Sequence, residues 1–527
     1  MKKSFFLVLI TLCITAFSSL YSQSIYVATN GSDNNPGTFV APYATIAKAA
    51  LQTTPGDTVF IREGTYTLNQ QIIPKSGATN KPITYRAYEN EIVIIDGGEG
   101  PCFTLQFKEY LVFEKLKMTT SSTNVGASII YMEASNYCTF QNCEFYGMPP
   151  ENGSENTAVI RCMGTENGYS NNCVFQNNYF HDNLSPALRL YDTKGWVITN
   201  NEFYKCKQAI GGKDDPNDML IKQNLIVNSS EAAFYFPFQN GGKNVTITEN
   251  IVINSKTAFI IGGLGTNNNM REGLNVYNNT IYNCTGFIQG WDDHFTTNFN
   301  FWNNIVYSNV SADIGTGADI AARILNMNRW NAIASINTVN YNFEFNCLMI
   351  PNEDKSMWFL AGNNNYFYDI TGWNTFIGFE NNSISQNPKF INSTEMNFHL
   401  ATDSKCIGAG KNGEDIGAYP RGNDGSVIGI TNGAITPVEI PNPPTTSEKE
   451  NYIIYPNPSL NQKITIDNLS SNITTIKVYD LKGVLIYKVT DIGKKHIIDK
   501  EVFKSDGIYI INITEKNVAI NQLIIVH

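Results

Sequence analysis

Cationic, aromatic and amide side chains recur through the middle of the chain. They are Arg161, Arg189, Tyr191, Lys213, Tyr235, Gln289 and Trp291. Aromatic rings stack on the CH faces of sugars, and fixed charged or amide groups bind sugar hydroxyls and carboxylates. If the fold brings these side chains together, their types indicate a surface that binds carbohydrate.

One reaction that such a surface could perform is β-elimination from a uronic acid. The C5 proton becomes acidic only when the adjacent carboxylate is neutralised by calcium or arginine, and a base must then remove it. Lys213 is the candidate base, Arg189 is the candidate neutralising group, and Tyr191 or Tyr235 is the candidate proton donor. The side chains expected to bind substrate are Arg161, Tyr235, Gln289, Trp291 and His181.

Carboxylates follow Lys213 closely in the sequence KDDPND and predict a calcium site. They are Asp214, Asp215 and Asp218, and their oxygens are the ligands that calcium prefers. Calcium would also resolve a conflict at Lys213, because neighbouring carboxylates favour its charged form, which cannot accept a proton. Without calcium we expect Lys213 to hold the substrate carboxylate, and Tyr191 or His181 to act as the base.

A second reaction, glycoside hydrolysis, would use two of the aspartates. Asp192 and Asp214 are expected on adjacent coils, near the roughly 5 Å separation of retaining enzymes. Asp215 and Asp292 would be further apart, towards the range of inverting enzymes. The local sequence favours neither pair.

These residues are far apart in the sequence, so the elements that position them must stack. An Asn followed by a short apolar strand recurs at Asn178, Asn201, Asn224, Asn250, Asn279 and Asn304, with Cys143 one unit earlier. The units are roughly 23 to 29 residues long, and each is too small to bury a core alone, so we expect them to stack into a coil. A stacked Asn can adopt the left-handed conformation at a corner and bond the same amide in the next coil.

A second strand follows each Asn corner, as in PALRLYD at 186–192 and QAIGGKDD at 208–215. Strand alternation places the apolar side chains inside the coil and the cationic and aromatic candidates outside it. The side chains expected inside are Leu188, Leu190, Ile210, Phe234, Phe236 and Ile288. Because neighbouring coils lie about 4.8 Å apart, the outer side chains should form a patch that a sugar can cover.

Motifs at both ends of the coil carry a family resemblance. The start contains YVATNGSDNNPGT at 26–38 and PGDTVFIREGTY at 55–66, and the close contains NPKFIN at 387–392 and CIGAGKNGEDIGAY at 406–419. With the Asn column, this pattern resembles the secreted right-handed parallel β-helix proteins of the pectate-lyase-like type. The resemblance implies a polysaccharide-degrading protein.

The catalytic motifs of individual β-helix families match only in part. The KDDPND segment is similar to the paired-aspartate calcium site of polysaccharide lyase family 9, but the Gly-Trp between the aspartates is absent. Lys213 and Arg189 resemble the lysine and arginine of the alginate lyase and chondroitinase B family, in the opposite order along the coil. The reaction type therefore stays open, and the polymer is not named by the sequence.

The two ends of the chain indicate export. Residues 1–22 read as a signal peptide, with Lys2 and Lys3 before a short apolar stretch. Residues 431–450 are rich in Pro, Thr and Ser and predict a linker. Residues 451–527 contain VYDLKGVLIY and GIYIINI, which predict a small antiparallel β-sandwich that resembles the type IX secretion C-terminal sorting domain of Bacteroidetes.

The composition limits the partners. With 37 Lys and Arg against 47 Asp and Glu, the chain has a net charge of −10, so nucleic acid is not an expected partner. Without the signal-peptide Cys13 there are nine cysteines, an odd number. We interpret them as small hydrophobic side chains stacked inside the coil, and one or two disulfides remain an alternative in an exported protein.

Together these features predict an all-β chain: a single-stranded right-handed parallel β-helix at 23–430, followed by a small C-terminal antiparallel β-sandwich. We expect a monomer that is exported through the periplasm and secreted or held at the cell surface, with the type IX machinery as a partner. The expected activity is that of a polysaccharide lyase on an acidic polysaccharide, with calcium as the candidate cofactor. The alternatives are a glycoside hydrolase and a non-catalytic glycan-binding protein.

Overall fold

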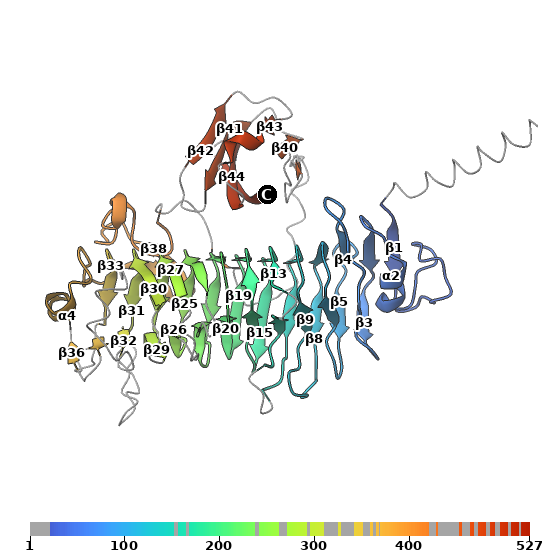
Figure 1. The fold of residues 1–527 in the computed structure, drawn as a ribbon, viewed down its shortest axis with the longest axis horizontal. Helices are drawn as coiled ribbons and strands as arrows, with labels where there is room; N and C mark the ends of the chain where they lie inside the picture. The colour runs from blue at the N-terminus through green and yellow to red at the C-terminus, as the bar shows by residue number, and fades with distance from the viewer. Residues whose placement is uncertain are drawn as a thin grey trace, which may run out of the picture. The chain divides into compact units, whose positions relative to one another are not determined.

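The computed structural model is a long coil of stacked strands and a separate C-terminal unit (Figure 1). The described residues are 22–151, 156–164, 168–237, 242–262, 271–291, 296–309, 325–327, 342–350, 359–361, 365–367, 369–420, 428–429, 453–455, 464–467, 473–480, 485–490, 496–503, 507–515 and 518–526. The first unit ends at Gly433 and the second begins at Ala434. The predicted linker and nearly all of the predicted signal peptide lie outside the described residues.

Three long sheets run along the coil, and each successive coil adds one strand to each sheet through parallel pairing. Sheet A consists of β1 (Ser24–Val27), β2 (Thr58–Ile61), β4 (Ile83–Ala87), β7 (Leu111–Glu114), β10 (Thr139–Gln141), β14 (Val174–Gln176), β18 (Val197–Thr199), β21 (Leu220–Lys222), β24 (Lys243–Thr248), β27 (Arg271–Tyr277), β30 (Thr296–Trp302) and β33 (Asn342–Glu344). Sheet B consists of β3 (Gly64–Thr67), β5 (Val93–Asp96), β8 (Lys117–Thr119), β11 (Glu144–Tyr146), β15 (Tyr179–Asn183), β19 (Glu202–Cys206), β22 (Leu225–Val227), β25 (Ile251–Ile253), β28 (Thr280–Tyr282), β31 (Ile305–Tyr307) and β34 (Cys347–Met349).

Sheet C carries the strands that were expected to follow each Asn corner. It consists of β6 (Phe103–Gln106), β9 (Ile130–Glu133), β12 (Ile160–Met163), β16 (Leu188–Tyr191), β20 (Gln208–Lys213), β23 (Ala232–Phe236), β26 (Thr257–Gly262), β29 (Gly286–Trp291), β32 (Leu325–Met327), β35 (Phe359–Ala361) and β36 (Asn365–Phe367). Only the last pair, β35 with β36, is antiparallel among the described pairs of this sheet. The predicted parallel β-helix is confirmed.

The core lies inside the coil, where like side chains stack from one coil to the next. Phe140 stacks on Phe175 with ring centroids 4.8 Å apart, and Phe180 stacks on Phe203 at the same distance. All four rings are fully buried. The spacing equals the distance between neighbouring strands, so in-register pairing brings the rings into contact without any adjustment of the backbone.

The predicted Asn column forms a ladder of side-chain amides. The Nδ2 of Asn201 donates to the Oδ1 of Asn224 at 3.0 Å, and the Nδ2 of Asn224 donates to the Oδ1 of Asn250 at 2.9 Å. Each Oδ1 also accepts the backbone N–H of the preceding Asn, as Asn224 does from Asn201 at 2.9 Å. Cys143 stands at the start of this column, since its N–H donates to the Oδ1 of Asn178 at 3.0 Å. The ladder therefore satisfies buried backbone groups that the corners would otherwise leave unpaired.

The left-handed corners belong to the residue before each ladder Asn, which corrects the prediction that one Asn serves both purposes. These residues are Asn177, Asn200, Gln223, Glu249, Asn278 and Asn303, with φ between 53° and 56°. Because the corner and the ladder are formed by different residues, Gln and Glu can occur in the corner column, whereas every ladder position from Asn178 to Asn304 is Asn. A corner needs only a tolerable positive φ, but the ladder needs an amide of one length.

The ladder continues beyond the predicted repeats to Asn346, whose Oδ1 accepts the N–H of Asn304 at 2.9 Å. The Nδ2 of Asn346 then donates to the carboxylate of Glu380 at 2.9 Å. Burial raises the pKa of Glu380 to about 7, although hydrogen bonds from Asn346 and Ser383 oppose the shift. A buried carboxyl thus ends the ladder.

The coil is covered at both ends. At the amino end, α2 (Ile46–Gln52) buries Ile46, Ala49 and Ala50 against the core, and the Thr45 side chain caps it by accepting the Lys48 N–H at 3.1 Å. At the other end lies α4 (Ile370–Ile377), which contributes the fully buried Trp373.

A return segment, residues 388–420 with 428–429, runs back along the outer face of sheet B. It contains β37 (Phe390–Asn392), β38 (Asn397–Leu400) and the turns η1 (Ser393–Glu395) and η2 (Lys411–Gly413). Lys411 donates its backbone N–H to Asn303 at 2.7 Å, Ala418 donates to Thr280 at 3.0 Å, and Gly429 donates to Asn200 at 3.2 Å. The segment buries the apolar outer side chains of β22 and β25.

Nine cysteines occur in the described part of the chain, and all of them are buried and free. Seven of them belong to the core inside the coil, which agrees with their interpretation as small hydrophobic side chains, whereas Cys347 and Cys406 belong to a separate cluster with Ile305 and Ile416. Cys162 is one such residue, and burial raises the pKa of its thiol to about 12.

The C-terminal unit consists of two small antiparallel sheets around its own core. One sheet contains β39 (Ile453–Tyr455), β40 (Ile464–Asp467) and β43 (His496–Ile498), and the other contains β41 (Ile473–Asp480), β42 (Leu485–Thr490), β44 (Gly507–Glu515) and β45 (Val518–Val526). A short turn, η3, spans Lys500–Val502. Ile466, Val478 and Ile511 are fully buried between the sheets, which confirms the predicted C-terminal antiparallel module. Among the described residues, no helix is long and apolar enough to cross a membrane.

Replacing Asn224 by Leu tests the ladder. The change leaves the buried backbone N–H and the Nδ2 of Asn201 without their acceptor and removes the amide donor to Asn250, so we expect the free energy of unfolding to fall by about 3 kcal/mol. Urea denaturation measures this loss. Asn275→Ala is the matched control, because Asn275 bonds only a neighbouring side chain, Asn300, on the half-buried outer face. Equal effects of the two changes would contradict the role of the ladder.

Candidate functional site

The outer face of sheet C brings the predicted side chains into two parallel columns. Pairing aligns Arg161 with Arg189, Arg189 with Gly211, and Gly211 with Tyr235. In the second column Tyr191 pairs with Lys213. The apolar residues that alternate with them, Leu188, Leu190, Ile210, Phe234, Phe236 and Ile288, are buried inside the coil. The predicted inward and outward alternation is therefore observed.

Gly211 opens a hollow in this face because it places no side chain between Arg189 and Tyr235. These two residues are two coils apart, roughly 10 Å. The hollow has an empty volume of about 510 Å³, open to solvent. It is lined by Glu151, Arg189, Lys207, Gln208, Gly211, Lys213, Glu231 and Tyr235. Three of the predicted residues, Arg189, Lys213 and Tyr235, thus face one space.

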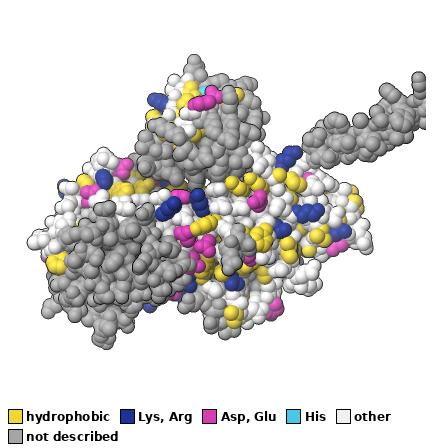
Figure 2. Space-filling model, in the orientation of Figure 1, with side chains coloured by type: hydrophobic (Ala, Val, Ile, Leu, Met, Phe, Trp, Pro, Cys, Tyr) yellow, Lys and Arg dark blue, Asp and Glu magenta, His cyan; other side chains and the backbone are white. Residues whose placement is uncertain are grey.

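A chain of alternating charges crosses the hollow. The Nη1 of Arg189 lies 2.7 Å from the Oε1 of Glu151, and the Nζ of Lys207 lies 2.5 Å from the Oε2 of the same carboxylate. Lys207 also lies 3.6 Å from Glu231. The residue Arg189 is only 7% exposed, so an outward-facing guanidinium is covered by an ion pair. On the face of the molecule drawn in Figure 2, acidic and basic side chains lie close together.

Sequence reasoning missed Glu151, Lys207 and Glu231. A signal existed for two of them, since Lys207 and Glu231 immediately precede the paired strands β20 and β23, whose Gln208 and Ala232 are partners. Extending the strand alignment by one residue places both side chains at the same edge of the hollow. Glu151 lies in the connection between β11 and β12, where no repeat pattern marks it.

Tyr191 and Lys213 form a second feature beside the hollow. The Nζ of Lys213 lies 5.5 Å from the centroid of the Tyr191 ring, and the Tyr191 hydroxyl donates to the Oδ1 of Asn156 at 2.7 Å. Burial raises the pKa of Tyr191, while the charges of Lys213 and Arg189 oppose the shift. The phenol therefore keeps its proton at neutral pH.

Arg161 continues the column one coil earlier and is held by its own contacts. Its Nη1 donates to the carbonyl of Gly126 at 2.6 Å, and its guanidinium lies 5.5 Å from the centroid of the Tyr131 ring. Tyr131 in turn donates its hydroxyl to Glu133 at 2.8 Å. This cation and this phenol extend the polar face beyond the hollow.

The predicted calcium ligands do not meet. Asp218 accepts a hydrogen bond from Asn244 at 2.9 Å, and Asp215 accepts one from the hydroxyl of Tyr169. Within the described ranges, no three His, Cys, Asp or Glu side chains are grouped so that they could hold a metal ion. The calcium prediction relied on the closeness of these aspartates in the sequence, and the positive φ of Asp214 and Asp218, 62° and 51°, places both residues outside the extended backbone of a strand. The described structure therefore does not bring Asp214, Asp215 and Asp218 together as the three ligands that were expected.

Asp192 and Asp214 remain close enough to interact. Burial, together with the charges of Asp214 and Asp215, raises the pKa of Asp192 to about 6. Burial also raises the pKa of Asp214, which Lys213 opposes and Asp215 reinforces. Asp192 and Asp214 are thus neighbouring carboxyls whose pKa values are both raised.

His181 lies on a different sheet from the hollow, which corrects its predicted place in the site. It belongs to β15 of sheet B, where its ring stacks on Tyr179 with centroids 4.3 Å apart. Its Nε2 lies 3.2 Å from Glu144 and its Nδ1 lies 2.9 Å from Asp182. Burial disfavours the charged form, but these two carboxylates outweigh it and raise the pKa of His181. His181 closely follows an Asn corner in the sequence, but that corner leads into sheet B and not into sheet C, which carries the hollow.

Gln289 and Trp291 stand further along sheet C. Gln289 pairs with Ile260, which follows Tyr235 in the first column, and Trp291 pairs with Gly262. Gln289 is three coils beyond the hollow's Gly211 and does not line it. The side chain of Trp291, and the whole of Asp292, fall outside the described residues.

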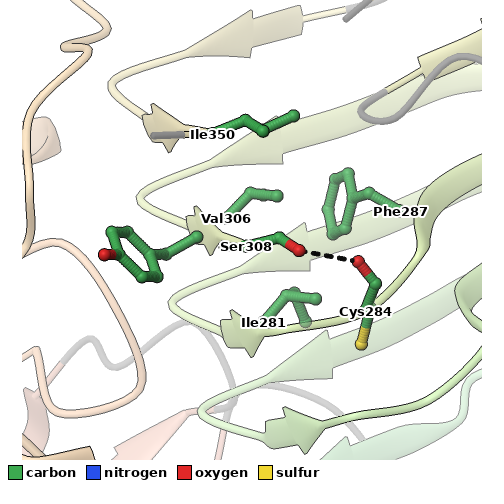
Figure 3. A pocket seen from close by; sticks show the side chains of 7 residues that line it. Ile281, Cys284, Phe287, Val306, Ser308 and Ile350 are labelled. Carbon is green, nitrogen blue, oxygen red and sulfur yellow. Dashed lines mark hydrogen bonds between the residues drawn. The ribbon is translucent and has the colours of Figure 1, made fainter. Parts of the chain in front are cut away.

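A second hollow, inside the coil, has a different character (Figure 3). It is lined by Ile281, Cys284, Phe287, Val306, Tyr307, Ser308 and Ile350. Its one drawn hydrogen bond joins the hydroxyl of Ser308 to the carbonyl of Cys284 at 3.1 Å. Because no charged residue lines it, this hollow is part of the packing of the coil and offers no chemistry to a sugar.

The fold and the polar face define a right-handed parallel β-helix with a C-terminal sorting module. The model of the Pel9A-like, right-handed beta helix region matches residues 25–331, and that of the secretion system C-terminal sorting domain matches residues 453–527. The chain therefore belongs to the Pel9A-like right-handed β-helix family. Its type IX sorting domain indicates a secreted or cell-surface protein that interacts with the secretion machinery.

Curated relatives match a shorter part of the coil. Pectate lyase PEL9 of Emericella nidulans is 34% identical over 145 residues, which are 27% of this chain and 33% of that protein. The uncharacterized protein YwoF of Bacillus subtilis is 39% identical over 123 residues, 21% of this chain and 26% of that protein. The chain thus spans about a third of the first relative's length and about a quarter of the second's.

Solved structures with similar coils include pectate lyase Pel9A, at 17% identity and a TM-score of 0.38 over 77% of this chain and 98% of that one. The complex of XylC with xylose gives 12% identity and a TM-score of 0.45 over 65% of this chain and 86% of that one.

The pH dependence of stability tests the environment of Asp192. Its pKa is about 3.9 in an unfolded chain and about 6 in the folded protein. The folded state binds the proton more tightly, so this group's contribution to stability is full below about pH 4 and is lost as the pH rises through about 6. We expect Asp192→Asn to lessen that fall in the free energy of unfolding, measured by urea denaturation at several pH values. Glu99→Gln, at an exposed position, is the control, and identical pH profiles for the two variants would refute the assignment.

Proposed function

We propose that this protein cleaves a uronic-acid-containing polysaccharide by β-elimination. The observation that carries the proposal is the hollow on sheet C, in which Arg189 and Lys207 together bind a carboxylate, that of Glu151. A site that already holds a carboxylate between two cations has the chemistry to hold the carboxylate of a uronate. Family membership and the distant pectate lyase relative support the same class of substrate.

In this mechanism Arg189 neutralises the substrate carboxylate and makes the C5 proton acidic. Lys213 accepts that proton as the base, although the carboxylates of Asp214 and Asp215 beside it favour its charged form, and the electron pair of the C5–H bond forms the double bond between C4 and C5. The bond from C4 to the leaving oxygen breaks, and Tyr191 donates a proton to that oxygen. The raised pKa of Tyr191 suits a donor rather than a base.

The remaining side chains would bind the polymer on either side of the reacting sugar. Tyr235 borders the hollow two coils after Arg189, and Arg161 stands one coil before it. Their spacing follows the coil, so a polymer lying along the coil axis would meet one candidate side chain at roughly every 4.8 Å. Gln289 and Trp291 would meet more distant sugars of the same chain.

One observation favours a second candidate, a glycoside hydrolase. Burial and the charges of Asp214 and Asp215 raise the pKa of Asp192 to about 6, and a carboxyl with a raised pKa is what a hydrolase uses as its general acid. In that case Asp192 would protonate the leaving oxygen, and Asp214 would act as the nucleophile.

Substitution of Lys213 by Ala separates these functions. Removal of the base should lower the rate of formation of the conjugated uronate, followed by ultraviolet absorbance on a panel of acidic polysaccharides, by roughly 10²-fold or more. Asp192→Asn should retain activity, and Lys194→Ala, at an exposed position outside the hollow, is the matched control. The converse pattern, with new reducing ends but no ultraviolet product, would instead establish hydrolysis. A wild-type protein that binds a polymer and yields neither product would be a glycan-binding protein.

A further inference from the structure

We propose that Glu151 is an internal stand-in for the substrate's carboxylate, so that the resting protein occupies its own binding site and substrate must displace it. This inference rests on the proposed function and adds to it a self-inhibiting contact and a basis for substrate choice. Both oxygens of Glu151 are engaged, one by Arg189 at 2.7 Å and the other by Lys207. A uronate carboxylate has the same two oxygens and would accept the same two donors.

The contacts of Glu151 are those that a displaceable group should have. Its side chain is 13% exposed and faces a hollow that is open to solvent. It lies in the connection between β11 and β12, outside all three sheets. Withdrawal of its side chain therefore breaks no pairing between strands. Arg189, in contrast, lies within β16, and Lys207 directly precedes β20, so the paired strands of the coil hold both cations in place.

Charge balance makes the exchange feasible. Arg189 and Lys207 face Glu151 and Glu231, so this cluster of four side chains has no net charge. If a uronate takes the place of Glu151, two cations still face two anions. If Glu151 left without a replacement, the 8% exposed side chain of Arg189 would be a nearly buried charge without its partner, which is strongly unfavourable. The site thus opens for an anion and stays closed to a neutral sugar.

The substrate class follows from this exchange. A neutral polysaccharide offers no group that can replace the carboxylate of Glu151, so it would have to break the ion pair without compensation. A polymer with a carboxylate on the sugar to be cleaved replaces both contacts of Glu151. The same geometry thus discriminates between anionic and neutral polymers by competition with an internal anion.

The test is binding of glucuronate and of polygalacturonate to the full chain carrying Lys213→Ala, which prevents turnover, with and without Glu151→Gln. If an internal carboxylate occupies the site for more than nine-tenths of the time, less than one-tenth of the protein is free to bind ligand. The apparent affinity is then reduced tenfold or more. We therefore expect Glu151→Gln to bind glucuronate about tenfold more tightly or better, measured by calorimetry. Glu151→Asp, whose shorter side chain reaches the two cations less well, should show a smaller gain and serves if the Gln variant does not fold.

The matched control is Glu114→Gln. Glu114 pairs with Arg86 at 3.4 Å and has a side chain that is 15% exposed, but it lies on sheet A. It should leave the affinity for glucuronate unchanged. Binding that is unchanged or weaker in the Glu151 variants would overturn the inference and make Glu151 a positioning residue for Arg189. The Glu151 variants could bind glucuronate more tightly while the unmodified protein cleaves no polymer. That result would support the role of Glu151 as a stand-in and would contradict only the proposed function.

Discussion

The structure depends on amide-to-amide hydrogen bonding along the coil. Each ladder Asn satisfies a backbone N–H and an amide of its neighbour, so the corners of successive coils are fixed at one strand spacing. That spacing aligns the rings of the core, as in the stack of Phe140 on Phe175. It also aligns the outward side chains of sheet C. A site that draws on Arg161, Arg189 and Tyr235 can exist only because the coils do not slip past each other.

The candidate site follows from the same regularity combined with one gap. Gly211 interrupts a column of side chains, and the interruption becomes a hollow whose walls are Arg189 and Tyr235. Lys207 and Glu231 close its edge because they precede equivalent strands. The periodic backbone determines which side chains lie on this face, and the lack of a side chain at Gly211 determines the shape of the hollow.

Much of this could be predicted from the sequence, because strand alternation and the Asn column are local patterns with a fixed period. The alternation correctly separated Leu188 and Leu190 from Arg189 and Tyr191. Prediction failed where the period ends. Glu151 lies in a connection without a repeat, and Asp214 and Asp218 have positive φ, so the strand pattern does not extend to them. His181 was misplaced because two recurring strands in the sequence do not reveal that each coil has a third sheet.

The separation between ladder and face has a consequence for how such proteins diversify. The amides that hold the coils together point inward, and the side chains proposed to meet a polymer point outward from another sheet, so an outer side chain can change without disturbing the ladder. Substitution of the outer side chains of a single coil can then change the specificity without changing the fold. A family built in this way would be expected to share its ladder asparagines far more faithfully than its outer side chains.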